Sequence, residues 1–97
     1  MARVSHDDDT VQFRCPGCGR LHILNLDQSE RPCWSFNGDD DRPTISPSIN
    51  AWVEGPAGQI RSRCHSFVEA GRIRFLPDCM HELAGQTVDL PDLQPEA

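Results

Sequence analysis

The pentapeptide Cys15-Pro16-Gly17-Cys18-Gly19 constrains the fold of this chain more than any other stretch. Two cysteines separated by Pro and Gly form a tight turn, called a zinc knuckle, that points both sulfurs at one spot. The proline fixes one backbone angle, and the glycines allow backbone N–H groups to approach the thiolates closely. A knuckle supplies two of the four ligands of a structural zinc ion, so the sequence predicts bound Zn2+ and two further ligands elsewhere.

The composition fits a small domain that gains stability from a metal ion. The chain has 97 residues, which is enough for one domain, and only 37% of them are hydrophobic. An interior this small benefits from a metal cross-link. The net charge of -6 repels phosphate backbones, so we do not expect nucleic acid as a partner.

The sequence shows no sign of a membrane or secreted protein. No apolar run approaches the ~18 residues of a membrane-spanning helix. Residues 1–10 lack the apolar segment of a signal peptide. We therefore expect a cytoplasmic protein whose five cysteines are metal ligands or free thiols rather than disulfides.

Short alternating segments separated by turn residues predict a mostly β fold, a small zinc-ribbon-like antiparallel sheet domain with one short helical turn. We expect a disordered tail over residues 1–10, a single zinc-binding domain over 11–90 and a disordered tail over 91–97. The expected strands cover residues 11–14, 21–26, 33–36, 49–53 and 87–90, with a hairpin inside 60–76 and the helical turn at 78–85.

The hairpin is the most informative of these elements. With Ala70-Gly71 as its two-residue loop, Val68 lies opposite Ile73 and Ser66 lies opposite Phe75. Alanine is unusual at this loop position, and a slip of one residue would exchange the two faces. In the expected register the core face carries Ile60, Ser62, Cys64, Ser66, Val68, Ile73, Phe75 and Pro77. The opposite, basic face carries Arg61, Arg63, His65, Phe67, Arg72, Arg74 and Leu76.

The same parity suggests the far half of the zinc site. Cys64 and Cys79 fall on one face of neighbouring segments, roughly 5–8 Å apart, so their sulfurs can converge on an ion. The predicted ligands of a closed structural site are therefore Cys15, Cys18, Cys64 and Cys79. One alternative set is Cys15, Cys18, Cys79 and His81, and another replaces Cys64 with His22. Cys33 lies opposite its aromatic neighbours in a short strand and is expected to be a free thiol.

A second group of residues falls on the basic face. Asp78 shares that face with His65, and a carboxylate beside an imidazole fixes its tautomer and orientation. Ser48 follows two prolines that stiffen the backbone, so it is presented as a candidate nucleophile. Ser66 is a weaker candidate because its side chain points into the core. The nearby arginines could hold a substrate that carries a carboxylate.

Five sequence blocks carry a resemblance to a known family: Cys15-Pro-Gly-Cys18, Pro43-Thr-Ile-Ser-Pro-Ser48, Cys64-His-Ser-Phe-Val68, Gly71-Arg-Ile-Arg-Phe-Leu76 and Asp78-Cys-Met-His-Glu-Leu-Ala-Gly85-Gln-Thr-Val88. They resemble small Cys/His-rich phage and prophage proteins of unknown function. That family is often named ammonia monooxygenase, an enzyme that is membrane-embedded. The absence of a membrane segment here speaks against the name.

More distantly, the chain is similar to zinc-stabilised serine peptidases of bacterial operons that conjugate ubiquitin-like proteins. The resemblance covers Pro47-Ser48 and Cys64-His65-Ser66, and it implies that Ser48 is the nucleophile and His65 the base. The resemblance to the small phage and prophage proteins implies a chain encoded by a phage or prophage and located in the cytoplasm of the bacterial host cell. The role of Asp78 comes from the hairpin register and not from the resemblance.

Two functional hypotheses follow. The first is a Ser-His hydrolase, a peptidase that acts on a protein tail such as that of a ubiquitin-like protein. The alternative is a non-enzymatic zinc-binding module of phage origin that binds a host or phage protein. A weaker third hypothesis is nucleic-acid binding through the arginines of the basic face.

Overall fold

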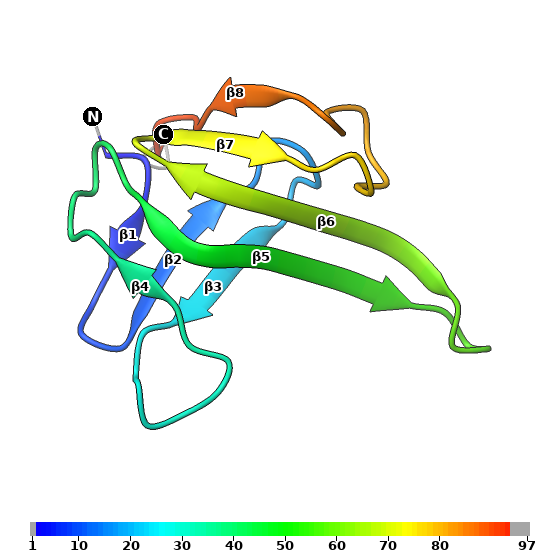
Figure 1. Cartoon of the computed structure of the whole chain (residues 1–97), viewed down its shortest axis with the longest axis horizontal. Helices are drawn as coiled ribbons and strands as arrows, with labels where there is room; N and C mark the ends of the chain where they lie inside the picture. Colours follow the sequence, from blue (N-terminus) through cyan, green and yellow to red (C-terminus); the bar gives the residue numbers. More distant parts are fainter. Residues whose placement is uncertain (1, 94–97) are drawn as a thin grey trace.

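The computed structural model describes residues 2–93, in which all regular secondary structure is β (Figure 1). A three-stranded sheet has the order β1 (Ser5–His6), β2 (Thr10–Arg14) and β3 (Leu21–Asn25). A five-stranded sheet has the order β4 (Ser35–Phe36), β5 (Ile45–Glu54), β6 (Ile60–Glu69), β7 (Arg72–Phe75) and β8 (Thr87–Asp89). All neighbouring strands are antiparallel. The described residues include no helix that could cross a membrane.

The alternation of side chains explains the hairpin of β6 and β7. Every second residue is buried in both strands, with Cys64, Ser66 and Val68 facing inward from β6. The predicted register is confirmed: Ser66 pairs with Phe75, and Glu69 pairs with Arg72 across the two-residue loop. The loop needs positive φ at both positions, and Ala70 adopts +49° although it carries a side chain.

The two sheets pack face to face over one hydrophobic core. In Figure 1 the three-stranded sheet lies across one end of the larger sheet, and the β5–β6 hairpin runs on beyond it. The small sheet contributes Val11, Phe13 and Leu24 to this core. The larger sheet contributes Ile45, Ile49, Cys64, Val68, Ile73 and Phe75. A mostly β antiparallel domain is therefore confirmed, with two sheets where the sequence predicted one.

The segment over residues 78–85 was expected to be a helical turn, and the structure shows connected turns and no helix there. Local turn bonds such as that from the amide of Ala84 to the carbonyl of His81 do not continue into a helix, and two other amides bond to the hairpin. The amide of Met80 donates to the carbonyl of Arg63, and the amide of Gly85 donates to that of Phe75. These bonds fasten the segment across the end of the β6–β7 hairpin.

Strand β5 is longer than predicted and includes Pro47. It tolerates a proline because its pairing with β6 is irregular between Ile45 and Ile49, where no ladder bond from residue 47 is required. Ser46 pairs instead with Ser35 of β4. Regular pairing with β6 resumes at Ile49, the residue after Ser48.

Residues 2–10, expected to be a disordered tail, pack against the domain. Strand β1 pairs with β2, and Val4 is fully buried in the core. Arg3 bonds from its side chain to the carbonyl of Leu90, which is itself buried. The amide of Leu93 donates to the carbonyl of Ala2, and the rest of the expected C-terminal tail, 94–97, lies outside the described residues.

Candidate functional site

Ser48, His65 and Asp78 form a continuous chain of hydrogen-bonding contacts. His65 Nε2 lies 3.3 Å from Ser48 Oγ. On the other side of the ring, His65 Nδ1 lies 3.1 Å from Asp78 Oδ2. When Nδ1–H donates to the carboxylate, Nε2 is left to accept the hydroxyl proton of the serine. This is the order of contacts in a Ser-His-Asp triad.

Three different segments bring these side chains together. Ser48 lies at the end of the irregular stretch of β5, and the indole N–H of Trp34 donates to its carbonyl oxygen at 3.3 Å. His65 lies on the outward face of β6 because the buried Cys64 and Ser66 occupy the inward face. Asp78 follows β7, in the turn where the amide of Leu76 donates to the carbonyl of His65.

The side chain of Cys79 hydrogen-bonds to both backbone polar groups of His65. The amide of His65 donates to Cys79 Sγ at 3.2 Å, and the Cys79 thiol donates to the carbonyl of His65 at 3.1 Å. The sulfur is buried, so water competes little for these two contacts. Both backbone polar groups of His65 are thus fixed, and they limit how far the imidazole can move relative to Ser48.

Ser66, the weaker nucleophile candidate, is fully buried, and its hydroxyl has no hydrogen-bond partner within residues 2–93. A substrate cannot reach it. Ser48 is half-buried and has a histidine within reach, so Ser48 is the serine that can be activated.

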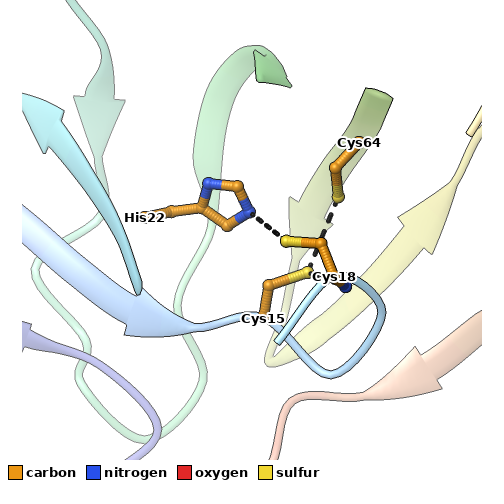
Figure 2. A group of neighbouring side chains, drawn as sticks. All are labelled: Cys15, Cys18, His22 and Cys64. Carbon is orange, nitrogen blue, oxygen red and sulfur yellow. Dashed lines mark hydrogen bonds between the residues drawn. The ribbon is translucent and has the colours of Figure 1, made fainter. Parts of the chain in front are cut away.

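A second cluster lies on the inner side of the same strand. Figure 2 shows the side chains of Cys15, Cys18, His22 and Cys64 converging from β2 and the knuckle, β3 and β6. Their ligand atoms all lie within 4.8 Å of one another. The sulfurs of Cys15 and Cys64 are 3.6 Å apart, and His22 Nε2 lies 3.4 Å from Cys18 Sγ. In a tetrahedral site with zinc–sulfur bonds of about 2.3 Å, sulfurs lie roughly 3.8 Å apart, so these spacings can hold a metal ion.

The protonation of the cluster also suits a cation. The pKa of Cys15 is lowered to about 3, chiefly because the thiol of Cys64 donates a hydrogen bond to its sulfur. The same bond, together with burial, raises the pKa of Cys64. Burial raises the pKa of Cys18. One thiolate is thus favoured, and further ionisation is resisted unless a positive charge compensates it.

Comparison with protein families identifies the lineage of this chain. The family model described as bacterial ubiquitination-like system serine protease (BubE) matches residues 1–76. The chain belongs to this family. No curated protein and no solved structure matches it.

The BubE match agrees with the predicted resemblance to serine peptidases of ubiquitin-like systems. The matched range contains Ser48 and His65 and also the whole Cys15, Cys18, His22 and Cys64 cluster. Asp78 lies two positions beyond the matched range, so its assignment depends on the geometry alone. The phage or prophage origin stays a prediction.

The four-residue cluster differs from the predicted zinc set at one position: His22 takes the place expected for Cys79. Cys79 is buried, as its parity predicted, but its sulfur turns to the backbone of His65. A sequence signal for His22 existed. It precedes Leu24 by two residues, so the two share a face of β3, and that face is the buried one.

Cys79 and the alternate ligand His81 form a second, overlapping group with Cys64. His81 packs edge-on against Phe75 and lies so close to Gly17 that a Cβ there would sit 2.4 Å from its ring. Its Nδ1 accepts a bond from the amide of Leu83, while Nε2 is buried without a partner in the described chain. A side chain at position 17 would therefore require the His81 ring to move. Cys33 belongs to neither group, and its role as a free thiol stays a prediction.

Proposed function

We propose that this BubE-family protein is a serine peptidase that cleaves the tail of a protein substrate in a bacterial ubiquitination-like system. Ser48 is the nucleophile, His65 the general base and Asp78 the residue that orients it. The proposal rests on one observation, the contact chain Ser48–His65–Asp78, found in a chain of a serine protease family. A substrate that is itself a protein tail fits an open site on a sheet face.

The proposed reaction follows from this arrangement. Ser48 Oγ attacks the carbonyl carbon of the scissile peptide bond while His65 Nε2 takes the hydroxyl proton. His65 then returns this proton to the departing amine as the C–N bond breaks, which leaves an ester between Ser48 and the acyl part of the substrate. Water, deprotonated by His65, hydrolyses the ester and restores the serine. Asp78 accepts the Nδ1–H bond throughout and stabilises the transient imidazolium.

We further propose that the Cys15, Cys18, His22 and Cys64 cluster binds Zn2+ and that the ion is structural. Four protein ligands complete a tetrahedral shell and leave no position for substrate or water. When bound, the ion supplies a cross-link between the three-stranded sheet and β6. Since Cys64 immediately precedes His65, this cross-link also fixes the strand that carries the base.

A fluorophosphonate probe tests the proposed activity because it reacts covalently with activated serines. The zinc-loaded protein should be labelled on Ser48, and Ser48→Ala should abolish the labelling. Ser35→Ala is the control, since Ser35 is an exposed serine on β4 of the same sheet and should leave labelling on Ser48. Folded, zinc-loaded protein that resists labelling would contradict the peptidase proposal.

A non-catalytic protein-binding module is the second candidate. It is favoured by two large apolar side chains on the outer face of β3, Leu21 and Ile23, which are 44% and 59% exposed. Adjacent exposed apolar residues on a small sheet suit contact with another protein. Absence of probe labelling together with binding of a protein partner through this face would favour this candidate.

A further inference from the structure

A cavity of about 420 Å3 opens on the outer face of the five-stranded sheet. Its walls come from the start of β5, the end of β6, β7 and the edge strand β8. Phe67 lines it, and Phe67 follows His65 by two residues in β6, so both project from the same face. Ser46, two residues before Ser48, lines the opposite wall. The cavity therefore begins about 7 Å from the catalytic histidine, measured along the strand.

Three charged residues line this cavity: Glu69, Arg72 and Arg74. Arg74 lines the cavity, and its guanidinium lies over the ring of Phe67, 4.8 Å from the centroid. Within residues 2–93 Arg74 has no ion-pair partner, whereas the neighbouring Arg72 is paired with Asp89 at 3.3 Å. Stacking on the aromatic ring holds the guanidinium flat while leaving its N–H groups available.

Arg72 and Arg74 lie on the outer face of β7 although the whole chain has a net charge of -6. Glu69 also lines the cavity, but it is exposed and lies opposite Arg72, not Arg74, in the strand register. Among the described residues that line the cavity, Arg74 is thus the cation without an ion-pair partner. A planar guanidinium matches a carboxylate in bidentate geometry.

We propose that this cavity is the subsite that receives a carboxylate of the substrate. Arg74 binds the carboxylate, and Phe67 positions the guanidinium. An extended peptide advances about 3.3 Å per residue, so the bound carboxylate lies about two residues from the scissile bond. It is supplied either by an acidic side chain or by the free C-terminus of a short tail. This inference rests on the proposed peptidase function, because only a peptidase has a substrate subsite here.

Cleavage of matched peptides tests the proposal in the zinc-loaded full chain. One set carries Glu or Gln at each position within two residues of the cleaved bond, and a second set ends in a free or an amidated C-terminus. Binding of a charged partner through hydrogen bonds predicts a preference of about tenfold or more for the carboxylate form in one set. The Glu/Gln set reports a side-chain carboxylate, and the free/amide set reports the C-terminus.

Substitutions of Arg74 test whether this residue causes the preference for the carboxylate peptide. Arg74→Gln should bring the ratio of the two rates close to one, and Arg74→Glu should reverse it in favour of a basic or amidated peptide. Arg61→Gln is the matched control, since Arg61 is an exposed arginine of the neighbouring strand β6 and does not line the cavity. A wild-type ratio near one in both sets, or a ratio unchanged in Arg74→Gln, would overturn the subsite.

A binding measurement keeps the subsite testable even where no peptide is cleaved. The ring resonances of Phe67 are followed while the peptide acetyl-Gly-Gly-Glu-amide, acetyl-Gly-Gly-Gly with a free C-terminus, or the neutral acetyl-Gly-Gly-Gln-amide is added to Ser48→Ala protein. A saturable shift with a carboxylate peptide, absent with the neutral one and in the Ser48→Ala, Arg74→Gln double variant, supports the proposal. No selective shift refutes it. Failure of fluorophosphonate labelling refutes the peptidase function instead, so the two failures are distinguishable.

Discussion

The candidate metal-binding cluster and the Ser-His-Asp group lie on opposite sides of one strand. Cys64 and His65 are consecutive residues of β6, and Cys64 is buried in the first group while His65 faces outward in the second. The inner group is closed by buried side chains, whereas Asp78 of the outer group is 48% exposed. The period of two in a β-strand thus separates the proposed structural group from the proposed catalytic group.

The largest effect is expected from a substitution that removes a member of the cysteine cluster. Cys15→Ala should leave the domain unfolded, because binding of structural zinc supplies ~10–16 kcal/mol and a domain of this size has only ~5–15 kcal/mol of net stability. Circular dichroism with and without added zinc measures this. A Cys15→Ala protein that melts at the wild-type temperature would show that the cluster is not needed for folding.

The next largest effect is expected from a change that disrupts the Ser-His-Asp group and leaves the cysteine cluster intact. Asp78→Asn should lower the rate of peptide hydrolysis at least about 100-fold, because the amide cannot hold the imidazole tautomer that the reaction needs. The melting temperature and the zinc content should stay at wild-type values. Glu82→Gln, an exposed acidic residue of the same turn segment, serves as the control. Equal hydrolysis rates in both variants would remove Asp78 from the site.

A third prediction sharpens the boundary between the groups. His22→Ala should lower zinc affinity at least about tenfold, whereas Cys79→Ala should keep one zinc per chain and slow catalysis, because it releases the backbone of His65. Competition against a zinc chelator measures the affinity, and hydrolysis of one peptide measures the rate. The opposite pattern would restore Cys79 as the fourth ligand and exclude His22.

The smallest expected effect concerns the loop Ala70-Gly71, which joins β6, the strand that carries His65, to β7. Ala70 has φ of +49°, which costs an alanine about 1–2 kcal/mol. Ala70→Gly removes this strain and loses ~0.5–1 kcal/mol through the entropy of the unfolded chain, so the net gain is roughly 0.5 kcal/mol. Thermal unfolding should show a rise of about 2–4 °C. Ala57→Gly, in a turn without positive φ at that residue, should show no rise.

The hairpin register and the separation of its faces could be read from the sequence because they depend on local alternation. The contact of His65 with Asp78 followed from that register, and so did the burial of Cys64. The place of His22 in the candidate metal-binding cluster could not be read from the hairpin register, because it depends on how the three-stranded sheet packs on the five-stranded sheet. Parity within the hairpin placed Cys79 on the correct face but could not show that the turn after β7 bends its sulfur toward His65.

The N-terminal segment shows a second limit. Asp7, Asp8 and Asp9 make the first ten residues look too polar to fold, yet Val4 is fully buried and Asp7 accepts bonds from the amides of Asp9 and Thr10. The buried Val4 and the turn residue Asp7 accompany the pairing of this segment with the edge of the three-stranded sheet. Neither is visible as periodicity in so short a segment.

If Cys64 binds zinc and His65 is the base, as proposed, their adjacency couples hydrolysis to the supply of a trace nutrient. In a cell short of zinc the base would lose its support, although no residue that touches the substrate has changed. Hydrolysis would then follow the availability of the metal.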